Sequence, residues 1–203
     1  MLVSSLHQTS PGRFTVTLED GTEIKSTLNV VTDLRIYTGR ELDEAALREL
    51  QAASALARTK NRAMDLLSRR PMSAKELYDK LVEKGEPAEA SAAAVRWLLD
   101  NRFLNDELYA GMVVRHYAGK GYGIGRIRQE LHRRGIDKGL WDEALREMPE
   151  SDEKLDRFLA ARLKDPGDPE QVRKVSAALF RRGYGWDEIK SALRRCAAET
   201  EEE

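Results

Sequence analysis

The densest group of side chains that could do chemistry is a basic cluster in the middle of the chain. Residues 115–146 contain eight basic and four acidic side chains, whereas the whole chain of 203 residues has a net charge of −1. Arginine predominates, and its planar guanidinium group suits the recognition of carboxylates and phosphates. We therefore expect contacts with a partner or a polyanion to centre on this stretch. The candidate contact residues are Arg115, Lys120, Tyr122, Arg126, Arg128, Arg133 and Arg134.

A helix over residues 124–134 is expected to position most of this cluster. Ile127 and Leu131 are four residues apart and predict one buried stripe, which leaves the arginines on the other faces of the helix. Tyr122 and the neighbouring Tyr117 could stack on a nucleic-acid base or cover a hydrophobic contact. The alternative is that the arginines form only a solvated helix face.

The glycine-rich segment 119–125 superficially resembles a phosphate-binding loop. It lacks the Gly-Lys-Ser/Thr ending of such loops, and no hydrophobic strand precedes it. We therefore expect a flexible connection between two helices rather than a nucleotide site.

Other catalytic or metal-binding patterns are missing from the sequence. The three histidines are not spaced as metal ligands, and we expect His116 and His132 on exposed helix faces. Cys196 is the only cysteine, which excludes an intramolecular disulfide and a cysteine-cluster zinc site. Acidic residues are scattered over charged helix faces. We expect no catalytic, cofactor-binding or metal-binding residues, and a protein that is not an enzyme.

The chain also lacks the patterns that direct a protein to a membrane. No apolar run approaches the length of about 18 residues that a membrane span needs, and the start does not resemble a signal peptide. We expect a soluble, cytoplasmic protein.

The first 50 residues predict a small β-structure. Residues 13–18 and 22–26 alternate between apolar and polar side chains, and Asp20-Gly21 between them favours a hairpin turn. Residues 2–6 could add a third strand. A hairpin alone is only marginally stable in water, so we expect it to pack on segment 30–50.

From Asp43 to Cys196 the hydrophobic period is that of amphipathic helices. Ser73 and Glu76 have the spacing of a capping box, and Pro71 before them should end the preceding helix. Asp168 followed by Pro169 predicts another helix start.

Three copies of one pattern indicate an internal repeat. Residues 77–85, 127–135 and 175–183 each place two aliphatic residues four apart and a glycine four residues later, and these glycines are 50 and 48 residues apart. The fold class we predict is mainly α: three tandem three-helix repeats in an elongated stack, preceded by a small β-hairpin-containing N-terminal extension. The expected parts are the extension 1–50, repeats 51–105, 106–150 and 151–197, and an acidic tail 198–203.

Several motifs together resemble the RecX regulators of bacterial recombination. The resemblance covers residues 55–196 and includes the order and spacing of the motifs. These are Ser73–Leu77 with Leu81 and Gly85, Phe103–Ala110, Gly121–Leu131 with Arg134–Ile136, and Arg182–Ile189.

The resemblance implies a function in the regulation of DNA repair, homologous recombination and the SOS response. A member of this family is expected to bind the RecA filament on single-stranded DNA and to inhibit its strand exchange, ATP hydrolysis and co-protease activities. We expect a monomer without cofactors that has, at most, a weak direct contact with DNA. The alternative function is that of a helical-repeat protein that binds nucleic acid directly.

Overall fold

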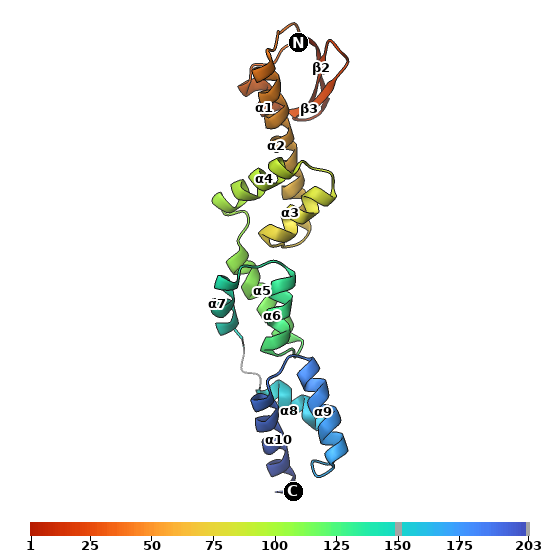
Figure 1. The fold of residues 1–203 in the computed structure, drawn as a ribbon, viewed down its shortest axis with the longest axis vertical. Coiled ribbons are helices and arrows are strands. Elements are labelled where there is room, and N and C mark those ends of the chain that lie inside the picture. Colours follow the sequence, from red (N-terminus) through yellow and green to blue (C-terminus); the bar gives the residue numbers. More distant parts are fainter. Residues whose placement is uncertain (149–151, 202–203) are drawn as a thin grey trace. The chain divides into compact units, whose positions relative to one another are not determined.

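The computed structural model describes residues 1–148 and 152–201. The chain divides into two compact units, Met1–Leu104 and Asn105–Glu203. Three strands and the first four helices lie in the first unit, and the remaining helices of the described chain lie in the second (Figure 1).

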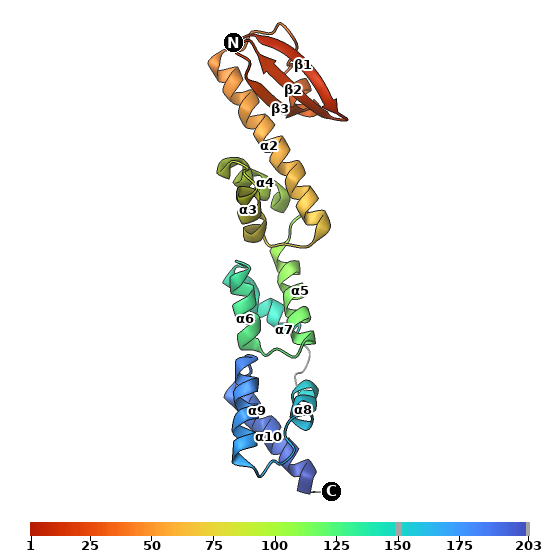
Figure 2. The ribbon, with the colours of Figure 1, turned by 90° about the vertical axis from the view of Figure 1, so that its right-hand side faces the viewer.

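The N-terminal strands form an antiparallel sheet in the order β1-β2-β3 (Figure 2). Their bounds are Val3–Ser10 for β1, Arg13–Leu18 for β2 and Glu23–Thr27 for β3. The turn between β2 and β3 contains Asp20, whose carboxylate accepts a hydrogen bond of 2.9 Å from the Thr22 amide. The predicted hairpin of β2 and β3 is confirmed. The additional strand expected over residues 2–6 is β1, which is longer than expected and extends to Ser10.

The sheet packs on segment 30–50, as expected, and the helical part of this cover begins at Leu28. Segment 28–50 contains helix α1 (Leu28–Asp33) and the start of α2 (Glu44–Arg69). Val16 and Leu18 of β2 pack in one buried cluster with Val30, Val31 and Leu50. Because α2 also packs against α4 (Ala88–Asp100), one helix belongs to the extension and to the first three-helix group. The boundary expected at residue 50 thus lies inside α2.

Helix α3 (Ala74–Glu83) starts at the predicted capping box. The Ser73 hydroxyl accepts a hydrogen bond from the Glu76 amide at 3.0 Å, and the Glu76 carboxylate accepts one from the Ser73 amide at 3.2 Å. Helix α2 ends two residues before Pro71. The core of this group contains Leu77, Leu81 and Leu98, which have no exposed surface.

The second unit contains two further three-helix groups. The first consists of α5 (Asp106–Gly119), α6 (Ile124–Arg133) and α7 (Trp141–Arg146), with a short 3-10 turn before α7. The second consists of α8 (Asp152–Ala160), α9 (Pro169–Arg181) and α10 (Trp186–Glu201). Asp168 caps α9 and Pro169 is its first residue, as predicted. The mainly helical fold with an N-terminal sheet is confirmed.

The repeated glycine ends the middle helix of each three-helix group. Gly85, Gly135 and Gly183 have positive φ angles of 83°, 66° and 90°. The amide of the residue after each glycine donates to the carbonyl five residues before it, that of Leu81, Leu131 or Leu179. This is the hydrogen bond of a Schellman C-cap, in which a left-handed residue ends the helix. The same three leucines have no exposed surface. In each group, therefore, a single leucine supplies the carbonyl that accepts the capping hydrogen bond and a side chain of the core.

Gly183 also brings the two groups of the second unit into backbone contact. The Gly123 amide donates to the Arg182 carbonyl at 3.0 Å, and the Gly125 amide donates to the Gly183 carbonyl at 2.9 Å. A Cβ atom on Gly123 would lie 2.5 Å from the Gly183 oxygen, and one on Gly183 would lie 2.1 Å from the Arg126 nitrogen. Within segment 119–125, residues 120–123 connect α5 to α6, and Gly123 and Gly125 permit this close approach.

We predict that Leu179→Ala lowers the free energy of unfolding by about 2–5 kcal/mol, because it removes buried apolar volume and leaves a cavity. Denaturation followed by circular dichroism measures the loss. Phe180→Ala is the matched control: its side chain is 54% exposed, so we expect a loss below about 1 kcal/mol. Equal losses in the two variants would contradict the register of this repeat.

We also predict that Gly183→Ala and Gly85→Ala differ although both glycines end equivalent helices. Both variants incur the cost of a left-handed non-glycine residue, about 1–2 kcal/mol. Only the new Cβ at position 183 would clash, because nothing lies within 4 Å of the one at position 85. Hydrogen exchange should therefore become faster at residues 123–126 in Gly183→Ala and stay unchanged there in Gly85→Ala. Unchanged exchange in both variants would show that the close approach is dispensable.

Candidate partner-binding surface

Helix α6 positions the central part of the basic cluster. Gly123, its N-cap residue, has no side chain to cap the helix, and the carbonyl of Gly183 instead accepts from the first-turn amide of Gly125. Ile127 and Leu131 are fully buried, as predicted. The arginines at positions 126, 128 and 133 are consequently exposed on the remaining faces.

A buried glutamate joins two of these arginines. Glu130 is only 4% exposed. Its carboxylate oxygens lie 3.2 Å from Nη2 of Arg126 and 2.6 Å from Nη2 of Arg133. Because positions 126, 130 and 133 share one helix face, the two guanidinium groups are held side by side at the surface.

The ionisation of Glu130 reflects these contacts. Burial by itself would raise the pKa of this carboxyl, but hydrogen bonds from Arg133 and Tyr117 and the charges of Arg133 and Arg126 keep the pKa below its ordinary value. The same pairing raises the pKa of the Arg133 guanidinium. The three groups are therefore charged at neutral pH and carry one net positive charge.

Lys120 and two tyrosines lie beside this network. The ring centroid of Tyr117 is 6.0 Å from Nζ of Lys120 and 5.7 Å from the ring centroid of Tyr122. Arg182, which belongs to the next three-helix group, lies over the ring of Tyr122. The distance from Cζ of Arg182 to the ring centroid is 5.8 Å. Lys120 together with Arg126 and Arg133, the two arginines that Glu130 joins, is called the α6 arginine face below.

The other three arginine candidates make intramolecular contacts elsewhere in this three-helix group. Arg115 forms an ion pair with Glu147, and Arg128 lies 3.9 Å from a carboxylate oxygen of Asp142. Arg134 is half-buried and donates a hydrogen bond to the Tyr109 hydroxyl. The structure therefore divides the basic cluster into the α6 arginine face and separate intramolecular contacts.

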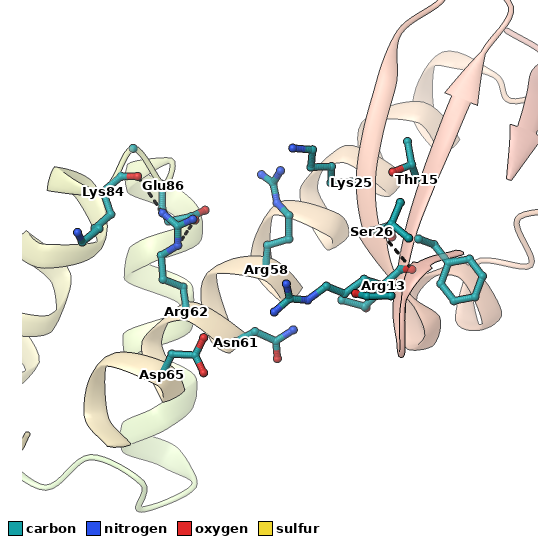
Figure 3. Close-up of a pocket in the computed structure, with 15 residues that line it drawn as sticks. Arg13, Thr15, Lys25, Ser26, Arg58, Asn61, Arg62, Asp65, Lys84 and Glu86 are labelled. Carbon is teal, nitrogen blue, oxygen red and sulfur yellow. Dashed lines mark hydrogen bonds and ion pairs between the residues drawn. The ribbon is translucent and has the colours of Figure 1, made fainter. Parts of the chain in front are cut away.

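Two features of the charge distribution were not predicted from the sequence. The first is Glu130, whose spacing of four and three residues from Arg126 and Arg133 was the available signal. The second is a group of basic side chains in the first unit that lines a groove between the sheet and α2 (Figure 3). No local signal pointed to this groove, because its residues come from distant segments and residues 1–50 are acidic overall.

The described residues contain neither a side-chain cluster suited to a metal ion nor a helix suited to span a membrane. Among residues 1–148 and 152–201, no three His, Cys, Asp or Glu side chains are grouped so that they could hold a metal ion. His116 and His132 are exposed, as expected. None of the helices in the described segments is long and apolar enough to cross a bilayer.

Comparison with known proteins relates the three-helix groups to one family. The model of the first three-helix domain of RecX matches residues 60–98, and that of the second matches residues 105–145. The regulatory protein RecX of Vibrio campbellii is 38% identical over 139 residues, which cover 66% of this chain and 89% of that protein. The regulatory protein RecX of Bacillus subtilis is 28% identical over 197 residues, which cover 94% of this chain and 75% of its own.

Solved structures share the fold at lower identity. A crystal structure of a regulatory protein RecX matches with a TM-score of 0.75 and 24% identity over 94% of this chain and 98% of that one. The structure of RecX from Lactobacillus salivarius matches with a TM-score of 0.63 over 72% of this chain and 99% of its own. From its sequence relatives and its matching domains, this chain belongs to the RecX family of regulatory proteins.

Proposed function

We propose that this chain is a non-catalytic regulator that binds the RecA filament on single-stranded DNA. It restrains the strand exchange, ATP hydrolysis and co-protease activity of that filament. It acts in the cytoplasm as a monomer and uses no cofactor. The observation that carries this proposal is membership of the RecX family, whose relatives are named regulatory proteins.

The α6 arginine face supports a filament contact. A fixed pair of guanidinium groups can donate several hydrogen bonds at once to carboxylates or to phosphates. Both kinds of acceptor occur on a protein filament that contains DNA. Each exposed charge pair contributes only about 0–1 kcal/mol, so such a regulator depends on several contacts made at once.

The alternative function is direct binding of nucleic acid without RecA. A pull-down against assembled filament, free RecA and bare single-stranded DNA separates the two functions. Strong retention on the filament and weak retention on bare DNA are expected for a filament regulator. Equal retention on bare DNA and on the filament would favour the alternative.

The experiment that tests the contact surface replaces the arginines together with the glutamate that they neutralise. We predict that the triple variant Arg126→Gln, Glu130→Gln, Arg133→Gln stays folded, because no charge is left buried without a partner. Its concentration for half-maximal inhibition of the filament ATPase should rise about tenfold at low salt, and the difference should shrink as salt weakens the electrostatic attraction.

The single variant Glu130→Gln is the matched control, because it keeps both arginines and removes the negative charge between them. It should inhibit much better than the triple variant, because the positive charges of Arg126 and Arg133 remain. Circular dichroism and a thermal melt verify folding in both variants. Full inhibition by the folded triple variant at low salt would exclude this face from the contact. Whether the chain binds the filament at all is tested separately by the pull-down.

A further inference from the structure

A second basic surface lies entirely within the first unit. It is a groove with a volume of about 760 Å³ between the sheet, helix α2 and the turn that joins α3 to α4. Figure 3 shows basic side chains that reach the groove from the sheet and from α2, and the backbone of the α3–α4 turn at its other end. The basic residues of the lining are Arg13, Lys25, Arg58, Arg62 and Lys84.

Four of these five cations are available to a ligand. Arg13, Lys25, Arg58 and Lys84 are exposed, and none of them has an ion-pair partner within residues 1–148 and 152–201. Arg13 and Lys25 come from the paired strands β2 and β3, whereas Arg58 comes from α2. The tertiary fold thus concentrates positive charge that the sequence spreads over more than 70 residues.

The fifth cation is used to hold the wall of the groove in place. Nε of Arg62 lies 3.1 Å from the buried Glu86 carboxylate, and Nη1 of Arg62 donates to the Lys84 carbonyl at 2.9 Å. The Thr59 hydroxyl donates to the other Glu86 oxygen at 3.0 Å. These bonds tie the α3–α4 turn to α2. The ion pair with Arg62 also neutralises the charge of Glu86. The one other acidic residue of the lining is Asp65.

The uncharged part of the lining consists mainly of hydrogen-bonding groups. Hydroxyl or amide side chains of Thr9, Ser10, Thr15 and Asn61 line the groove, and Phe14, its one aromatic residue, is half-buried. Arg, Lys, Ser, Thr and Asn are the residue types that contact nucleic-acid phosphates. A peptide partner would be expected to insert apolar or aromatic anchors, for which this lining has no deep apolar pocket.

We propose that this groove binds the phosphodiester backbone of a nucleic acid independently of its base sequence. Arg58, Lys25 and Arg13 reach the space between α2 and the strands from both sides, whereas the Lys84 side chain is directed away from it (Figure 3), so a small anion could contact only some of the cations. A nucleic-acid strand presents one negative charge per nucleotide and can contact all of them in series. The proposal does not rest on RecA regulation, because the strand is bound without a filament.

The test measures binding of the full chain to a fluorescent oligothymidylate, to a duplex of the same length and to polyglutamate, without RecA. The groove variant is Lys25→Gln with Arg58→Gln, which removes two positive charges and keeps both side chains polar. The matched control is Arg69→Gln with Arg96→Gln, which removes two exposed charges from the same unit outside the groove lining.

We expect the groove variant to bind the oligonucleotide about tenfold more weakly at ~50 mM salt. The slope of log Kd against log salt should fall by about 1.4 for the single strand, since each lost phosphate contact removes about 0.7. The control pair should change affinity less than about twofold. A circular-dichroism melt verifies that each variant is folded.

Groove-dependent binding of either nucleic acid supports the proposal, and the tighter of the two identifies the strand form that the groove accepts. Equal affinity of the folded groove variant and the control for both nucleic acids would overturn it. Tighter binding of polyglutamate than of either nucleic acid would also overturn it, because the groove would then be a site for an acidic polypeptide.

Discussion

The left-handed turn after the middle helix of each three-helix group is the constraint on which the helical fold depends. At Gly85, Gly135 and Gly183 the chain must reverse so that the third helix of the group returns over the buried face. The residue four positions before the glycine accepts the capping hydrogen bond through its carbonyl and fills the core with its side chain. The fixed spacing of leucine and glycine in the repeat is thus a direct consequence of C-cap geometry.

In the third group the same turn also organises its neighbour. The carbonyl of Gly183 accepts from the start of α6, a helix whose N-cap glycine cannot supply a side-chain acceptor. Since side chains at positions 123 and 183 would clash, the backbone contact explains why glycines occur on both sides. The α6 arginine face is therefore supported by the next group along the chain as well as by its own core.

The sequence alone predicted those parts of the fold that local chemistry determines. The Asp20-Gly21 hairpin, the capping box at Ser73 and the start of α9 at Asp168 each depend on residues within a few positions of one another, and all three occur in the structure. The shared helix α2 was not foreseen, because its two halves contact different cores. The basic groove was not foreseen either, since only the tertiary fold brings strand, helix and turn together.

The two basic surfaces differ in a way that follows from where their glutamates lie. Glu130 and Glu86 are both buried, and each holds an arginine in one orientation. On α6 the glutamate joins Arg126 and Arg133, so the geometry of these two side chains is fixed in advance. An arginine pair that is already ordered loses little side-chain entropy when a ligand binds it, which suits a specific partner. In the groove the glutamate holds only Arg62, and the remaining cations are exposed without ion-pair partners among the described residues. Such cations provide long-range, salt-sensitive attraction with little geometric selection, which suits a repetitive polyanion. A chain with a net charge of −1 can thus carry two cationic surfaces of different physical character.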